Sequence, residues 1–197
     1  MVGFRRMKAP ARTAVVVPIK SFELAKGRLA EVLSAEARAA LAKRCAEAVL
    51  HAAAPLAVFV VCDDDQVAAW ARASGATVVA APRPGLNEAA TAGREAARGA
   101  GYQRVLIVHS DLPKPGPLAT LAEVATDVVI VPDRHNDGTN ALLVSAAGDF
   151  TFRYGKGSFA AHQAEAGSRG WSVTVAQRPD LALDLDTPDD LTAAGLA

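Results

Sequence analysis

Three cationic side chains stand within nine residues, directly after an apolar run near the start of the chain. Lys20, Lys26 and Arg28 follow residues 14–19, whose continuous apolar character is typical of a β-strand buried on both faces. Lysine and arginine bind phosphate oxygens through charge-assisted hydrogen bonds, so this turn could clamp a polyanion such as a triphosphate. A solvated amphipathic turn remains open as the alternative, because these residue types usually lie at the surface.

Two groups of carboxylates also lie beside the ends of expected strands and helices, where a ligand could reach them. Asp111 comes after the apolar run 104–108, and Asp184 and Asp186 precede a helix start at Thr187. Carboxylate oxygens are preferred ligands of Mg²⁺, which keeps several waters when it binds. Asp111 could instead cap a following helix, but Thr187 already suits the cap position of the last helix, which leaves Asp186 without that role. Together with the cationic turn, Asp111 and Asp186 predict magnesium-assisted phosphoryl transfer.

Two polar loops add candidate binding groups. Residues 133–140 are too polar for a mere connection, and residues 153–158 lead into a helix. Gly155, Gly157 and Ser158 could present backbone N–H groups and a hydroxyl to a phosphate, although an ordinary glycine-rich helix cap is the alternative.

Other chemistries lack their motifs. There is no G-x-G-x-x-G after a strand and no G-x-S-x-G, which argues against a Rossmann nicotinamide site and a hydrolase nucleophile. Cys45 and Cys62 are too few for a disulfide framework or a cysteine-rich zinc site and are expected to be buried apolar side chains. The histidines show no ligand spacing and are expected to be structural or at the surface, with His162 kept open because it lies one turn after Ser158: they are His51, His109, His135 and His162.

The elements that position these groups alternate between strands and helices. Strands are expected at residues 14–19, 56–62, 77–80, 104–108, 127–131, 140–145, 172–177 and 181–185. Helices are expected from a Ser34 cap to about residue 53, from 64 or 65 to Gly75, from an Asn87 cap to about 98, at 158–166, and after Thr187. This alternation predicts a three-layer α/β/α fold with a mostly parallel sheet, residues 104–108 central, and ligands beyond the carboxyl ends of the strands.

Composition bounds the functional class. The 197 residues are 51% hydrophobic, which suits one domain over residues 13–197 preceded by a flexible tail at 1–12. Lys and Arg together number 21, as do Asp and Glu, so there is no basic surplus to favour nucleic acid. No apolar run approaches the roughly 20 residues of a membrane span, and no signal peptide is evident, so we expect a soluble, cytoplasmic protein.

Several segments together carry a family resemblance. In chain order they resemble the 2-phospho-L-lactate guanylyltransferase family, which makes the phosphodiester precursor of the deazaflavin coenzyme F-420. The match runs from about residue 14 to 191, and its most specific part is the PDR…GTNAL block. The segments are VPIK (17–20), AKGRL (25–29), GLN (85–87), SDLP (110–113), PDR (132–134), GTNAL (138–142), YG.GSF..H (154–162) and DLDTPDDL (184–191).

The resemblance implies a nucleotidyltransferase fold similar to the GT-A glycosyltransferases, and a reaction between GTP and a small phosphorylated acid. The acceptor in such families is 2-phospho-L-lactate, phosphoenolpyruvate or 3-phospho-D-glycerate. By resemblance, the triphosphate would contact Lys20, Lys26 and Arg28, and the nucleoside would contact Asn87. Mg²⁺ would be bound by Asp111 and Asp186. The acceptor would contact Thr139, Gly155 and Ser158. Lys156 stands where the family more often has proline or an acidic residue. A downstream transferase that takes the labile product is implied as a partner, and a homodimer is a further expectation.

Three other functions compete with this one. A related nucleotidyltransferase acting on a sugar phosphate or molybdopterin would carry a glycine-rich opening, where this chain has Pro18, Ile19 and Lys20. A non-catalytic GTP-binding module would not need both Asp111 and Asp186. A glycosyltransferase usually carries Asp-x-Asp after a mid-chain strand, and His109 replaces the first aspartate here.

Overall fold

The computed structural model describes residues 11–81 and 83–196, so most of the tail expected at residues 1–12 lies outside the described residues. Arg12 is described and is held in place. Its backbone N–H donates to Gln103 Oε1 at 2.7 Å, and its guanidinium lies 4.6 Å from the centre of the Tyr102 ring. The packed part of the chain therefore reaches back to Arg12, one residue before the first strand.

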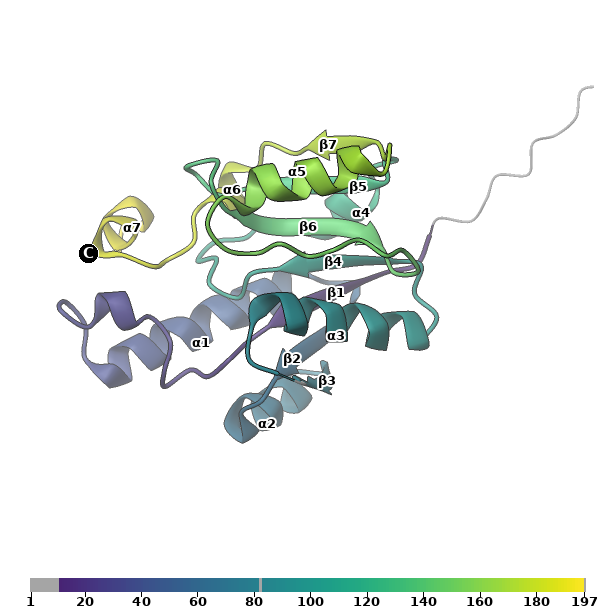
Figure 1. Ribbon diagram of the computed structural model, residues 1–197. Coiled ribbons are helices and arrows are strands. Elements are labelled where there is room, and N and C mark those ends of the chain that lie inside the picture. The colour runs from purple at the N-terminus through teal and green to yellow at the C-terminus, as the bar shows by residue number, and fades with distance from the viewer. Residues whose placement is uncertain (1–10, 82, 197) are drawn as a thin grey trace, which may run out of the picture.

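Seven strands form one sheet in the order β3-β2-β1-β4-β6-β5-β7, which puts β4 at the centre as expected (Figure 1). Strand β6 runs antiparallel to both its neighbours, and the remaining pairs are parallel. The short loop at residues 133–138 explains the exception, because a parallel crossover needs a much longer connection. The strands are β1 Thr13–Pro18, β2 Ala57–Cys62, β3 Thr77–Ala80, β4 Arg104–Val108, β5 Val128–Pro132, β6 Thr139–Ser145 and β7 Val173–Val175.

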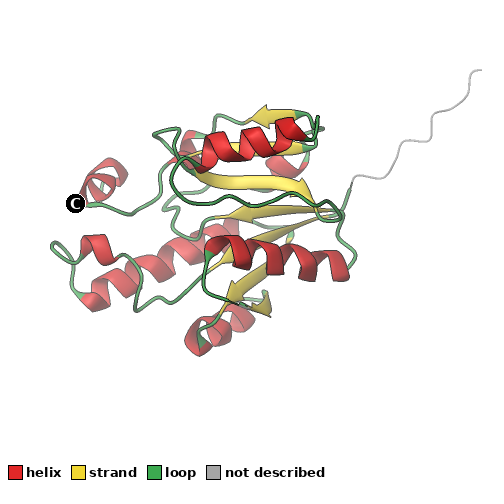
Figure 2. Ribbon diagram, viewed as in Figure 1, coloured by secondary structure: helices red, strands yellow, loops and turns green. Residues whose placement is uncertain are grey.

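Helices cover both faces of this sheet, which confirms the predicted three layers (Figure 2). Alternate residues of each strand face opposite sides. Val15 and Leu106 pack with α1 Ala35–Ala52 and α2 Asp65–Ala73 on one face. On the other face, residues such as Val16 and Ile107 pack with α3 Leu86–Gly99 and α5 Ser158–Ser168. The shorter helices are η1 Gly27–Leu29, α4 Ala119–Ala122, α6 Pro179–Ala182 and α7 Pro188–Ala194.

The predicted helix ends are largely confirmed. The Ser34 hydroxyl accepts from Ala37 N at the start of α1, and the Asp64 carboxylate accepts from Val67 N at the start of α2. Thr187 is the N-cap of α7, with a capping box that involves Asp190.

Asn87 does not cap its helix, contrary to the prediction. Helix α3 begins at Leu86, and its N-cap is Gly85, whose φ of 132° suits glycine. The Asn87 carboxamide instead accepts from Tyr154 N at 2.6 Å and donates to Tyr154 O at 3.3 Å. An asparagine near a helix start is typical of a cap, but a backbone 67 residues away has taken both its polar atoms.

The strand predicted at residues 181–185 is also wrong. The chain forms the single turn α6 over Pro179–Ala182 and then extends towards Thr187. A run of five residues cannot separate a short strand from one helical turn by apolar periodicity. Pro179 at the first helical position and Asp180 in the first turn are the signals that favoured the helix.

The remaining expectations concern Cys45, Cys62 and membrane spans. Both cysteines are buried as predicted, and burial raises the pKa of the Cys45 thiol to about 11. Over the described ranges, every helix is too short or too polar to cross a membrane.

Candidate functional site

The segments that follow the carboxyl ends of β1 and β4 meet the segment before α7. Strand β1 leads into the cationic turn, and β4 leads into residues 109–111. The segment that precedes α7 is held alongside by a hydrogen bond from Leu185 N to Asp111 O at 3.2 Å. This contact brings Asp186 next to Asp111, although the two are distant in sequence.

Lys26 joins the two carboxylates. Its ammonium nitrogen lies 2.7 Å from Asp111 Oδ2 and 3.6 Å from Asp186 Oδ1, and Arg28 lies 3.3 Å from the other Asp186 oxygen. The side chain of Lys26 is 5% exposed and that of Asp111 23%, whereas Asp186 is 45% and Arg28 75% exposed. Four of the residues predicted from the sequence therefore form one ion-pair cluster, which is buried at Lys26 and exposed to solvent at Arg28.

The backbone of Lys26 is strained. Its φ of 59° and ψ of 36° are left-handed, a conformation that costs a non-glycine residue about 1–2 kcal/mol. Lys26 precedes η1, so the strain lies at the turn that carries the ammonium to the carboxylates. Such strain persists only where the surroundings over-determine it, and it gathers at functional sites.

The pKa values of Asp111 and the nearby Asp184 are shifted in opposite directions. Burial is the largest single influence on the pKa of Asp111 and raises it, but the charges of Lys26 and His109 and the hydrogen bonds to the carboxylate together hold that pKa below its ordinary value. The pKa of Asp184 is raised, by burial first and then by the charge of Asp111. Asp184 Oδ1 also accepts a hydrogen bond from Asn140 at 3.3 Å. Asp111 is therefore the ionised member beside the cationic turn, and Asp184 supports the loop behind it.

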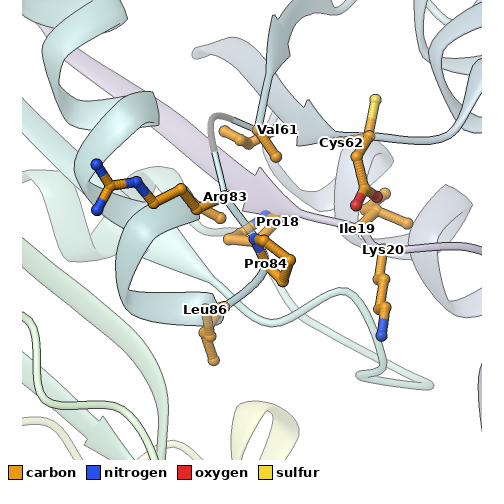
Figure 3. Close-up of a pocket in the computed structure, with 12 residues that line it drawn as sticks. Pro18, Ile19, Lys20, Val61, Cys62, Arg83, Pro84 and Leu86 are labelled. Carbon is orange, nitrogen blue, oxygen red and sulfur yellow. The ribbon is translucent and has the colours of Figure 1, made fainter.

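Two neighbouring cavities open at this end of the sheet. The first is about 310 Å³ and lies beyond β1, β2 and β3, with Lys20 and Cys62 on one side and Arg83 and Leu86 on the other (Figure 3). The second is about 230 Å³ and is lined by Lys20, Lys26, Asp111 and Asp186 among others. Lys20 lines both cavities, so an extended ligand that occupies the two would pass its side chain.

Thr139 and Ser158 form a buried polar cluster with His162. Thr139 Oγ1 accepts from Ser158 Oγ at 3.4 Å and lies 3.0 Å from His162 Nδ1. His162 Nε2 accepts from Arg153 N at 3.0 Å, which assigns the ring proton to Nδ1. Burial lowers the pKa of His162 to about 4, so the ring is neutral at pH 7.

The two polar loops predicted to bind substrate are joined to each other. Gly157 N donates to Asp137 Oδ2 at 3.2 Å, and Phe159 N donates to Asp137 O at 3.0 Å. Gly155 is exposed beside them with a φ of 130°, and Lys156 is exposed as well. Thr139, Gly155 and Ser158 therefore lie together, while Asn87 anchors this loop through Tyr154 and its neighbour Leu86 lines the first cavity.

The sequence of the domain matches a known family. Residues 13–195 match the family described as "Guanylyl transferase CofC like". The chain belongs to this family. The resemblance noted from its motifs is thereby confirmed.

Similar proteins carry matching names. A phosphoenolpyruvate guanylyltransferase of Rubrobacter xylanophilus is 40% identical over 184 residues, which cover 89% of this chain and 90% of that protein. A 3-phospho-D-glycerate guanylyltransferase of Phenylobacterium zucineum is 36% identical over 178 residues, covering 84% and 82%. In structure, a Desulfovibrio desulfuricans protein assigned as a nucleotide-diphospho-sugar transferase superposes with a TM-score of 0.75 at 16% identity, over 93% of this chain and 86% of that one. The predicted nucleotidyltransferase fold is confirmed.

Two residues near the site, His109 and Tyr154, were not predicted from the sequence as site residues. Their ring centres are 5.6 Å apart, and Tyr154 is 4.8 Å from the His162 ring. His109 Nε2 and Tyr154 Oη are buried, and neither has a hydrogen-bond partner within residues 11–81 and 83–196. The pair joins the 153–158 loop to the end of β4, two residues before Asp111. One available signal was the position of His109, two residues before Asp111 at the end of a strand.

The carboxylate pair fits a magnesium ion. Asp111 Oδ1 is buried and accepts no hydrogen bond from any described residue, so it has a free ligand position. Across those residues no group of three or more His, Cys, Asp or Glu side chains could hold a metal alone. Mg²⁺ is commonly bound by one or two carboxylates together with waters and substrate phosphates. Asp111 and Asp186 match that donor set.

Proposed function

We propose that the protein transfers a guanylyl group from GTP to the phosphate of a small phosphorylated acid and releases pyrophosphate. The observation that carries this proposal is the convergence of Asp111, Asp186 and Lys26 beside two adjoining cavities. The names of the relatives support phosphoenolpyruvate as the acceptor, with 3-phospho-D-glycerate as an alternative. The motif resemblance adds 2-phospho-L-lactate as a third candidate.

The two cavities suggest how GTP would lie. The guanosine would occupy the larger, mainly apolar cavity beside Leu86 and Arg83. The triphosphate would then extend past Lys20 into the second cavity, towards Lys26 and Arg28. Nucleotide sites in open α/β sheets lie beyond the carboxyl ends of the strands, which supports this orientation.

The joined polar loops would receive the acceptor. The exposed amide of Gly155 could donate to carboxylate or phosphate oxygens. Thr139 and Ser158 are buried and bonded to each other, so they would support this loop from beneath and not present free hydroxyls as the sequence predicts. Ser158 begins α5, whose N-terminal end favours an anion. Lys156 would add a positive charge at the mouth.

The reaction requires neutralisation of the negative phosphate charges more than it requires a strong base. An acceptor phosphate oxygen bonds to the α-phosphorus of GTP, and the bond from that phosphorus to the β-phosphate oxygen breaks. A phosphate monoester has a second pKa near 6, so its oxygen is already anionic at pH 7 and no general base is required. Two unit negative charges 4 Å apart repel by about 4 kcal/mol at an effective dielectric of 20. Lys20, Lys26 and Arg28 would offset that repulsion.

Asp111 and Asp186 would hold Mg²⁺, which when bound supplies Lewis-acid stabilisation of phosphate charge. Both carboxylates must be ionised to do so, and the low pKa of Asp111 secures this for the buried member. We place the reaction in deazaflavin coenzyme F-420 biosynthesis, followed by a transferase that consumes the labile product.

Pyrophosphate release tests the proposal. Purified protein is incubated with GTP, Mg²⁺ and, separately, each of the three phosphorylated acids or a sugar phosphate, with ATP and CTP as donor controls and Asp111→Asn as the matched inactive variant. Release that depends on GTP and one acceptor, and that EDTA abolishes, supports the assignment. Release only with a sugar phosphate would redirect it to another nucleotidyltransferase, and GTP binding without any release would favour a non-catalytic module.

A further inference from the structure

The ammonium of Lys26 occupies the position from which a cation would contact both carboxylates. It lies within salt-bridge distance of one oxygen of Asp111 and one of Asp186, and its side chain is almost fully buried. Lys20 is exposed, and Arg28 reaches only Asp186 from the solvent side. Lys26 is therefore the group that stands between the two carboxylates.

Such an arrangement makes the ammonium and a divalent cation competitors. The same two oxygens cannot hold both at close range, because the two positive charges would repel strongly in a partly buried site. Lys26 also does not satisfy the whole carboxylate pair, since Asp111 Oδ1 is buried and receives no hydrogen bond from the described residues. A metal would give that oxygen a partner, whereas Lys26 leaves it without one.

We propose that Lys26 closes the carboxylate pair to divalent cations in the free protein, and that the cation enters together with the nucleotide. The triphosphate takes over the Lys26 ammonium and frees the carboxylates for the metal. This inference rests on the proposed function for the identity of the nucleotide, and the exclusion of metal from the free protein does not depend on it.

The backbone of Lys26 suits such an exchange. Its left-handed conformation is held in a turn in which Leu29 N donates to Lys26 O at 2.9 Å, a contact that does not depend on the ion pairs. The lysine side chain has a flexible stem and a compact charge, and it can turn from a carboxylate to a phosphate without moving the backbone.

Binding of Mn²⁺, followed by the electron paramagnetic resonance signal of the free ion, tests the inference. The full chain is titrated with and without GTP, and no acceptor is added. Lys26→Gly removes the ammonium at a φ that glycine adopts freely, and Lys26→Met provides a second variant should the first fold poorly. Lys43→Met is the control, because it removes an exposed lysine of α1 that lines neither cavity.

Without GTP, the Lys26 variants should bind Mn²⁺ at least about tenfold more tightly than the unaltered protein, because a unit charge within 4 Å has been removed. Lys43→Met should match the unaltered protein. GTP should tighten Mn²⁺ binding to the unaltered protein by at least about tenfold, and this coupling should shrink in the Lys26 variants.

Equal Mn²⁺ affinities of the unaltered protein and the folded Lys26 variants in the absence of GTP would overturn the inference, even if guanylyl transfer is observed. Tighter binding by the variants supports it, even if none of the three acceptors is used. The outcome for the inference is thus separate from the outcome for the proposed function.

Discussion

Replacement of each carboxylate by its amide should separate function from stability. Asp111→Asn and Asp186→Asn should both reduce pyrophosphate release by at least about a hundredfold, because each removes a charged ligand from the shared site. Their effects on folding should differ, because Asp111 is mostly enclosed with Lys26 whereas Asp186 is half exposed.

The structure sets the size of that difference. Asp111→Asn leaves the enclosed Lys26 ammonium with only the longer 3.6 Å contact to Asp186. Removal of one partner from a buried ion pair costs about 3–5 kcal/mol, and the remaining contact places the expected loss near 3 kcal/mol. Asp186→Asn breaks contacts that solvent screens, so the expected loss is about 1 kcal/mol or less.

Urea unfolding at pH 7.5 measures the stabilities, and pyrophosphate release with saturating GTP and acceptor measures function. Asp189→Asn is the matched control, an exposed aspartate three residues from Asp186. Near-normal turnover in either variant would remove that residue from the proposed metal site. Equal destabilisation by both would refute the argument from burial.

Three further predictions concern the packing and the charges around the site. His162 is neutral in the folded protein with a pKa of about 4 but titrates near 6.5 when unfolded, so protonation favours unfolding as the pH falls below 6.5. Between pH 7 and pH 5 the unfolding free energy of the unaltered protein should therefore fall by about 2 kcal/mol more than that of His162→Gln, and parallel curves in urea titrations would contradict this. A Cβ on Gly93 would lie 2.2 Å from Val16 Cγ1, so Gly93→Ala should lose about 1–3 kcal/mol of stability in the same assay unless α3 can shift. Arg28→Ala should raise the KM for GTP several-fold and leave the unfolding midpoint unchanged, because its side chain is largely exposed; an unchanged KM would remove Arg28 from the triphosphate site.

Much of the fold could be predicted because its signals are local. The strands of the parallel core are continuous apolar runs, and caps such as Ser34 and Asp64 contact the backbone of their own helices. The gathering of Lys26 and Asp111 could also be predicted, since both follow strands whose carboxyl ends meet at one edge of the sheet.

The error at Asn87, unlike the local one at residues 181–185, comes from a partner distant in sequence. Asn87 has the side chain of a cap, but the Tyr154 backbone takes its polar atoms. Asp184 and Asp186 are alike in sequence, and only the fold gives Asn140 to the first and Lys26 to the second. The left-handed backbone of Lys26 had no sequence signal either, because lysine rarely adopts it.

The ion pairs also bear on the order in which ligands can bind. Before any ligand arrives, Lys26 and Arg28 balance the two carboxylates, so the cluster has no strong net charge to draw in either a free cation or a free anion. A triphosphate alone would take the cations and face two uncompensated carboxylates, and a metal alone would displace an enclosed ammonium that then has no partner. Each of those half-filled states leaves a partly buried charge unpaired, whereas the nucleotide and metal together leave none. The same charge balance that stabilises the free protein should therefore make binding of the two ligands mutually dependent.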